Sequence, residues 1–325
     1  MSFPLFQRPG TVVFLDDDHD YLEMLGVVLP RQWMVKLFSG PQECINYLQQ
    51  EPPLWEADAW NLQEMISQWR SGRALIPQIL AYWASDTRRY GLTKVCVVDY
   101  AMPSMDGLQA LGELIDWPGS RILLTGQADE QVAVNAFNRG LIDHFMTKQA
   151  PDISRRLMDA VSQLLAAPNA WQSQLWRATL TPEQMAALRV PSVVRDLSDF
   201  AARHWVEHVV LGDPFGVLGL SAEGQVSWLQ LESTDRLGDL AELARADDVD
   251  PSLIAEIRKG KKLIDLELRL ALGHGAEPEL KPAFALGRNE TLIGALFQLD
   301  RSYWPPQDAS YNAWLARQTK RRIEK

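Results

Sequence analysis

Five polar side chains follow short apolar runs in the first half of the chain, and together they could transfer a phosphoryl group. Asp16 and Asp17 come after one run, Asp99 after a second, Thr125 after a third and Lys148 after a fourth. Clustered carboxylates need a proton or a hard cation, and oxygen-only ligands with open positions suit Mg²⁺. Asp99 would then be free to attack phosphorus, while Thr125 and Lys148 would bind the phosphoryl oxygens that the metal leaves uncovered.

Each of these side chains follows a segment that is predicted to be a buried strand. Residues 95–98 are apolar throughout, as is typical of a parallel strand that is covered on both faces. The carboxyl ends of such strands form the edge where open α/β sheets place their chemistry. The other strands are predicted at residues 11–15, 34–38, 121–124 and 141–147, and residues 41–50 are predicted to form the helix after the second strand.

The order of these motifs resembles the receiver domain of two-component response regulators. The matching motifs are Leu15-Asp16-Asp17-Asp18, Asp99 with Met102-Pro103 and Asp106-Gly107, Leu124-Thr125-Gly126, and Phe145 three residues before Lys148. The resemblance implies an α/β, flavodoxin-like receiver: a doubly wound parallel five-stranded sheet within residues 1–166.

The resemblance also implies a role for each matching residue. Asp99 would be the phosphoacceptor, assisted by Thr125 and Lys148. Asp16, Asp17, Asp99 and the backbone carbonyl of Ala101 would hold Mg²⁺. Thr125 and Phe145 look like a switch pair, in which the hydroxyl moves toward the phosphoryl group and the ring turns inward behind it.

The chain departs from the receiver pattern in two places. Gln149 follows Lys148 where the pattern usually has proline, a residue that often takes the cis form there and shapes the loop that sets the reach of the lysine. The second departure is an insertion at residues 51–93, between the second helix and the third strand.

The insertion is predicted to form two amphipathic helices that are broken near Ser71-Gly72. Because it leads into the amino end of the third strand, we expect it at the edge of the sheet opposite Asp99. A docking surface for the rest of the chain or for a partner is the favoured interpretation, and a self-contained structural extension is the alternative. The apolar positions at helical spacing are Leu62, Met65, Ile66 and Trp69, followed by Leu75, Ile79, Leu80 and Trp83.

Composition favours a cytoplasmic signalling protein. The 325 residues are enough for about two domains, and a net charge of −10 argues against nonspecific binding to nucleic acid. Cys44 and Cys96 offer neither a disulfide framework nor a zinc spacing. No apolar run approaches the roughly 20 residues of a membrane span, and the amino terminus lacks a signal-peptide pattern. We therefore expect no membrane or nucleic-acid partner.

Residues 167–182 are predicted to be a linker helix, and residues 183–325 a second, α+β domain with an antiparallel sheet. One or two helices are predicted to reach Val210, and Ser221-Ala222-Glu223-Gly224 is predicted to turn a hairpin. Two short helices and three further strands follow, an order that resembles the PAS fold; a different α+β module is the alternative. The predicted strands are residues 215–220, 226–231, 263–272, 282–286 and 292–299.

Three features of this second half could carry other functions. His204-Trp205-Val206-Glu207-His208 matches the H-x-x-E-H pattern of inverted zinc peptidases, in which two histidines one helical turn apart share a metal. Core or interface packing of that predicted helix is the favoured alternative. His274 is predicted to be a solvated turn residue. Residues 317–325, with Lys320-Arg321-Arg322, are predicted to be a frayed helix end, and contact with an anionic partner is the alternative.

The leading hypothesis is a response regulator that receives its phosphoryl group from a sensor histidine kinase or a phosphotransfer protein. It would signal through contacts with a downstream protein, and it would not be an enzyme beyond its own phosphotransfer. No helix-turn-helix pair with a basic face, Walker loop or cyclic-dinucleotide signature is found in the sequence. The alternatives are a receiver-controlled metal hydrolase that uses His204, Glu207 and His208, and a phosphorylation-independent scaffold. Whether phosphorylation makes or breaks a homodimer stays open.

Overall fold

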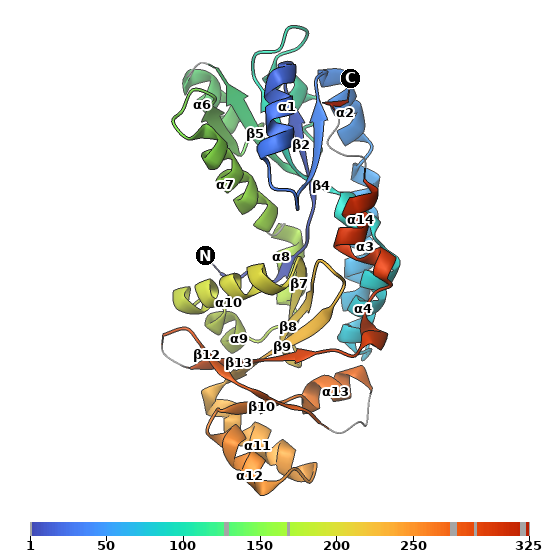
Figure 1. Cartoon of the computed structure of the whole chain (residues 1–325), viewed down its shortest axis with the longest axis vertical. Coiled ribbons are helices and arrows are strands. Elements are labelled where there is room, and N and C mark those ends of the chain that lie inside the picture. The colour runs from blue at the N-terminus through green and yellow to red at the C-terminus, as the bar shows by residue number, and fades with distance from the viewer. Residues whose placement is uncertain are drawn as a thin grey trace. The chain divides into compact units, whose positions relative to one another are not determined.

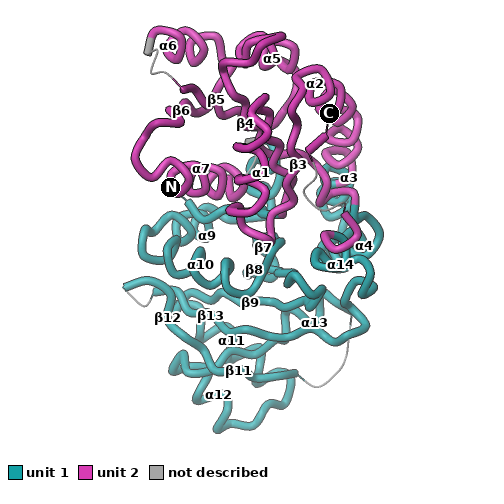
Figure 2. Tube along the Cα trace, turned by 45° about the horizontal axis from the view of Figure 1, so that its top comes forward, with its two compact units in different colours: residues 1–8, 62–87, 168–314 teal, residues 9–61, 88–167, 315–325 magenta. Residues whose placement is uncertain are grey.

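The structure is a computed structural model that describes residues 2–126, 130–167, 170–273, 278–288, 291–318 and 323–324 (Figure 1). The chain folds into two compact units (Figure 2). Each unit gathers separate stretches of sequence, whereas the predicted domains are contiguous. Unit 1 comprises Met1–Arg8, Leu62–Thr87 and Pro168–Trp314, and unit 2 comprises Pro9–Asn61, Arg88–Ala167 and Leu315–Lys325.

Unit 2 is built on a parallel sheet with the strand order β14-β3-β2-β4-β5-β6. The order from β3 to β6 is that of a flavodoxin-like receiver, so the predicted doubly wound sheet is confirmed. The strands are β2 (Thr11–Leu15), β3 (Met34–Phe38), β4 (Thr93–Asp99), β5 (Ser120–Thr125), β6 (His144–Thr147) and the short edge strand β14 (Ile323–Glu324).

The strand β14 corrects one prediction. Ile323 and Glu324 pair with Leu37 and Phe38 of β3 instead of ending a helix. The backbone of an edge strand offers unpaired hydrogen-bonding groups, and the chain satisfies them here, since Ser39 donates its N–H to the carbonyl of Glu324 (3.1 Å). Lys320, Arg321 and Arg322 lie outside the described residues.

Two apolar clusters, one on each face of the parallel sheet, make the core of unit 2. Val13, Cys96 and Val98 point into one cluster, and Val12 and Val97 into the other. This alternation explains why the strands are apolar throughout, because both faces are covered. The helices are α1 (His19–Val28), α2 (Pro41–Gln49), α5 (Gly107–Gly112), α6 (Glu130–Asn138) and α7 (Ile153–Ala166), with the 3₁₀ turn η1 (Arg88–Gly91) before β4.

The two predicted helices of the insertion are confirmed as α3 (Pro52–Arg70) and α4 (Leu75–Ser85). Gly72 ends the first of them with φ +98°, a left-handed conformation that glycine adopts without a steric penalty. Residues 62–87 belong to unit 1. Their buried side chains, among them Ile76, Ile79 and Trp83, enter the same apolar cluster as the strands of that unit. This part of the insertion is therefore core structure.

Unit 1 contains an antiparallel sheet with the order β1-β7-β8-β9-β13-β12, which confirms a second α+β domain. The predicted hairpin is β8–β9, with Gly224 at φ +89° in its turn. The PAS-like assignment stays a prediction. The strands are β1 (Phe6–Gln7), β7 (Glu207–Gly212), β8 (Phe215–Leu220), β9 (Val226–Ser233), β12 (Phe284–Leu286) and β13 (Leu292–Gln298), and β10 (Lys262–Ile264) pairs with β11 (Leu280–Pro282) in a second small sheet.

The predicted strand at residues 263–272 is wrong, because the chain turns into the helix α13 (Leu266–Leu272) after β10. Asp265 is buried and forms an ion pair with Arg269 four residues later (2.8 Å), which is the spacing of a helical turn. Leu270 is 77% exposed, so the alternating leucines do not share a buried face. The other helices are α8 (Ala170–Arg177), α9 (Pro182–Ala187), α10 (Pro191–His204), α11 (Leu237–Ala246), α12 (Pro251–Arg258) and α14 (Tyr311–Arg317), with 3₁₀ turns η2 (Thr234–Arg236), η3 (Arg301–Tyr303) and η4 (Gln307–Ala309).

Two further observations concern the predictions about membrane spans and cysteines. None of the helices in the described ranges combines the length and the apolar character that crossing a bilayer requires. Cys44 and Cys96 are both buried free thiols.

Candidate functional site

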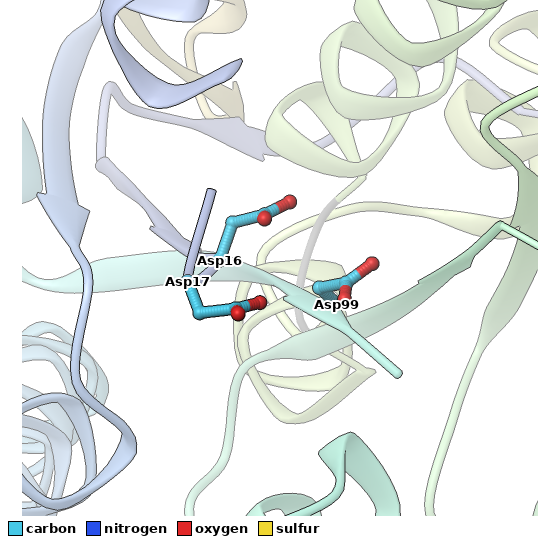
Figure 3. Close-up of side chains that lie close together, drawn as sticks. All are labelled: Asp16, Asp17 and Asp99. Carbon is cyan, nitrogen blue, oxygen red and sulfur yellow. The ribbon is translucent and has the colours of Figure 1, made fainter. Parts of the chain in front are cut away.

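Three carboxylates meet at the carboxyl edge of the parallel sheet (Figure 3). Asp16 and Asp17 follow β2 directly, and Asp99 is the last residue of the neighbouring strand β4. One oxygen from each of the three carboxylates lies within 4.8 Å of the others. Asp16 and Asp99 are buried, whereas Asp17 is exposed. The strand register thus brings together the acids that the sequence predicted at one edge.

Lys148 completes this cluster with a positive charge. Its Nζ lies 2.6 Å from Oδ2 of Asp16 and 2.7 Å from Oδ1 of Asp99. The lysine follows β6, and its backbone N–H donates to the carbonyl of Thr125 at the end of β5 (2.7 Å). Lys148 therefore reaches both acids although Gln149, and not proline, follows it.

The electrostatics of the site reflect this shared ammonium group. Burial raises the pKa of Asp16, and hydrogen bonding and attraction to Lys148 offset only part of that effect. Burial alone would lower the pKa of Lys148, but its hydrogen bonds to Asp16 and Asp99 and the charges of these two acids together outweigh burial, so the pKa is raised. A buried carboxylate that resists ionisation is stabilised by an added cation.

The donor set fits Mg²⁺. Asp16, Asp17 and Asp99 form the one convergent group of His, Cys, Asp and Glu ligand atoms within the described ranges. All of its donors are carboxylate oxygens, and one of them faces solvent, so water could fill the remaining coordination positions. Ala101 is exposed beside the cluster, and its N–H donates to Oδ2 of Asp99 (3.0 Å).

The loop after β4 is held close to Asp99 by its backbone. The N–H of Tyr100 donates to the carbonyl of Leu124 (2.7 Å), and the N–H of Gly107 donates to the carbonyl of Tyr100 (2.9 Å). Asp106 caps α5 through a capping box with Gln109. A Cβ atom on Gly107 would lie 2.3 Å from the carbonyl oxygen of Asp99, so the Asp106-Gly107 motif needs a glycine for space.

This close approach predicts the effect of a methyl group. Gly107→Ala should destabilise the protein by about 1–3 kcal/mol, because the backbone of the strand that carries Asp99 has to shift. Gly112→Ala is the matched control on the same helix. Apart from the adjacent residues and the backbone of the helix itself, no atom lies within 4 Å of its Cβ position, so the change should be neutral or stabilising by up to about 1 kcal/mol. Urea unfolding of both variants checks the prediction, and equal stabilities would contradict it.

Thr125 and Phe145 are brought to one face of two neighbouring strands. Thr125 is buried at the end of β5, and Phe145 on β6 lies opposite Leu123. Because side chains alternate along a strand, Leu123 and Thr125 share the face on which Phe145 lies. Phe145 is half-buried and packs against the cluster that contains Leu123. Their role as a switch pair stays a prediction.

Tyr21 is a site residue that the sequence motifs did not indicate. Its ring centroid lies 4.8 Å from Nζ of Lys148. Burial raises the pKa of Tyr21, and the charges of Asp16 and Asp99 add to the effect while Lys148 opposes it, which shows how close the phenol is to the cluster. The sequence carries only part of the signal, since the helix cap Asp18 puts Tyr21 in the first turn after the acids but does not show that the ring lies beside Lys148.

The H-x-x-E-H motif does not form a metal site. The predicted helix is wrong there, because α10 ends at His204 and Glu207 and His208 lie on β7. The motif needs His204 and His208 one turn apart on the same helix face, but His204 is the last residue of a helix and His208 lies on a strand. His208 stacks on Phe3 (5.0 Å between ring centroids), and one of its ring nitrogens lies 3.1 Å from the carbonyl oxygen of Pro4. His274 lies outside the described residues.

Comparisons with known proteins agree with this fold. No protein-family model matches the chain, and no match is found among curated proteins. The structure of the response regulator LqsR from Legionella pneumophila aligns with a TM-score of 0.73 and 23% identity, covering 98% of this chain and 97% of LqsR.

Isolated receiver domains align with about half of the chain. A CheY-like receiver domain protein from Methanospirillum hungatei is 16% identical, with a TM-score of 0.31, and covers 48% of this chain and 94% of its own. The receiver domain of the Francisella response regulator 1452 is 14% identical, with a TM-score of 0.30, and its alignment covers 48% of this chain and 95% of that domain. The strand order of the parallel sheet and the whole-chain alignment with LqsR together give the chain a flavodoxin-like receiver fold joined to a second, α+β domain.

Proposed function

We propose that this protein is a response regulator that accepts a phosphoryl group on Asp99, with Mg²⁺, from a sensor histidine kinase or a phosphotransfer protein. The observation that carries the proposal is the convergence of three carboxylates on one ammonium group at the edge of the sheet. A scaffold that is never phosphorylated would have no physical need to bury Asp16 and Asp99 beside Lys148. The whole-chain likeness to LqsR, a response regulator, supports the same proposal.

The chemistry is an in-line transfer. An oxygen of the Asp99 carboxylate bonds to phosphorus while the bond from phosphorus to the donor breaks, and the electron pair of that bond leaves with the donor. Bound Mg²⁺, held by Asp16, Asp17, Asp99 and the carbonyl of Ala101, would neutralise charge on the phosphoryl oxygens.

Two further residues act on the transferred group. The ammonium group of Lys148, which now contacts Asp99, binds a phosphoryl oxygen once Asp99 becomes an acyl phosphate, and it keeps its ion pair with Asp16. The hydroxyl of Thr125 donates to a second phosphoryl oxygen and couples the site to Phe145.

The proposed output is a change in protein contacts and not DNA binding or catalysis. The net charge of −10 disfavours a polyanionic partner, and the H-x-x-E-H residues of unit 1 do not assemble a metal site. A PAS-like second domain would suit contacts with a downstream protein. The proposed location is the cytoplasm, where the buried thiols Cys44 and Cys96 would stay reduced.

The test is labelling with acetyl phosphate. With Mg²⁺, intact-mass spectrometry should show one added phosphoryl group per chain, and hydroxylamine should remove it, as it removes an acyl phosphate. With EDTA the label should be absent, and Asp17→Asn should need more Mg²⁺ for the same labelling, because it removes one charged ligand. Labelling that persists in EDTA, or a label that resists hydroxylamine, would contradict the proposal.

A further inference from the structure

The ammonium group of Lys148 has a third neighbour besides the two acids. Nζ lies 2.6 Å from Asp16, 2.7 Å from Asp99 and 4.8 Å from the centroid of the Tyr21 ring. The two carboxylates form ion pairs with it, whereas the ring is uncharged and offers the electron-rich face of an aromatic group. The side chain of Lys148 is 23% exposed, so this cation–π contact is partly shielded from solvent, the setting in which such contacts are strongest.

The side chain of Lys148 has to be ordered by residues from other elements, because the strand β6 and the loop after it do little to restrain it. Its stem has four rotatable bonds, and a free lysine loses about 2 kcal/mol of rotamer entropy when it is ordered. The residue after it is Gln149, so the loop lacks the constraint of a proline ring. All four residues of β6, the strand that leads to it, are only half-buried.

Tyr21 is itself well fixed. It is the third residue of α1, and its backbone N–H donates to Oδ1 of the helix cap Asp18 (3.1 Å). Its ring is half-buried and packs against the apolar cluster that contains Leu22 and Leu25 of the same helix. The chain that carries the acid pair thus continues directly into the helix that presents the ring.

We propose that Tyr21 is a positioning residue for the phosphoryl-transfer site, because its ring confines the ammonium group of Lys148 to the place between Asp16 and Asp99 where it meets the phosphoryl oxygens. The residue acts through Lys148 and does not touch the reacting atoms. This inference rests on the proposed function for its effect on rate, but its structural part, the confinement of Lys148, does not.

The first measurement follows the rate of labelling by acetyl phosphate at saturating Mg²⁺. Tyr21→Leu keeps an apolar side chain but removes the aromatic ring. It should slow labelling by about 2-fold to 30-fold, the rate ratio that corresponds to the free energy of one cation–π contact. Tyr21→Phe keeps the ring face and should restore most of the rate. In a Lys148→Ala background, Tyr21→Leu should have no further effect, because its target is gone.

Tyr47 supplies the matched control. Its half-buried ring lies 4.7 Å from Nζ of Lys36 in the same unit, a similar cation–π pair that does not involve Lys148. Tyr47→Leu should label at the wild-type rate. If it slows labelling as much as Tyr21→Leu does, the effect reflects general loss of packing and the inference is wrong.

A second measurement separates this inference from the proposed function. The NMR order parameter of the Lys148 side-chain methylenes should fall in Tyr21→Leu and recover in Tyr21→Phe, whether or not the protein is ever phosphorylated. An unchanged order parameter would overturn the positioning role. A changed order parameter in a protein that acetyl phosphate does not label would leave the positioning role standing and overturn the proposed function.

Discussion

Asp99→Asn is expected to lose phosphorylation by at least about 10³-fold, because an amide is not a nucleophile and the neighbouring acids, Asp16 and Asp17, serve as metal ligands in the proposed function. The change is nearly isosteric. The amide oxygen can still accept the N–H of Ala101, which donates to Oδ2 in the native protein, so the loop after β4 should keep its conformation. What disappears is the charge beside Lys148 and the oxygen that attacks phosphorus.

Intact-mass spectrometry after incubation with acetyl phosphate and Mg²⁺ measures this loss. Asp20→Asn is the control, since Asp20 is exposed in the first turn of α1 and is not among the three carboxylates of the cluster. It should be labelled like the wild type. Substantial label on Asp99→Asn would move the acceptor to another residue and remove the central role that we propose for β4.

Trp83→Ala is expected to destabilise unit 1 by about 3–5 kcal/mol, the cost of emptying a large aromatic site in a packed core. Trp83 is 1% exposed and lies on α4, within the apolar cluster that also contains the strands β7, β8, β9 and β13. Domains are stable by only about 5–15 kcal/mol, so the loss is a large fraction of the total and could unfold the unit at ambient temperature.

Trp60→Ala on α3 is the matched control for this prediction. Trp60 is 68% exposed, so the change should stay within about 0.5 kcal/mol of the wild type. Urea unfolding followed by circular dichroism compares the two variants. If Trp83→Ala is as stable as Trp60→Ala, the insertion does not belong to the core of unit 1, and the alternative of a self-contained extension becomes the better interpretation.

The site could be predicted largely from sequence because each of its residues has a local signal. Asp16, Asp99 and Thr125 end runs that are buried on both faces, and an uninterrupted apolar run that ends in a polar residue is visible without any structure. The strand order then brings the residues together through backbone pairing. Tyr21 could not be found in the same way, because an aromatic residue in a first helical turn is usually packing, and only the fold shows that it faces Lys148.

The wrong secondary-structure predictions fall on short apolar segments whose hydrophobic pattern fits both the 3.6-residue repeat of a helix and the two-residue repeat of a strand. The predicted helix that reaches Val210 ends at His204 instead, because periodicity alone cannot distinguish a short buried strand from the end of a helix. Leu266 to Leu272 alternate as a strand would, yet the Asp265–Arg269 ion pair fits a helix. Ile323 and Glu324 pair with residues of β3 that lie near the other end of the sequence. A contact between such distant residues cannot be predicted from a local sequence pattern.

The divided make-up of unit 1 has a consequence for how the protein is made. Its core combines Phe3 and Phe6, the helices around Trp83, and a sheet in which every strand except β1 lies at or after Glu207. At about 5–20 residues per second, a ribosome needs on the order of 10 s to pass from Trp83 to Glu207. Throughout that interval the apolar faces of α3 and α4 lack the sheet that will cover them. We therefore expect the nascent chain to depend on chaperones during synthesis, and slow growth at low temperature to favour recovery of the folded protein.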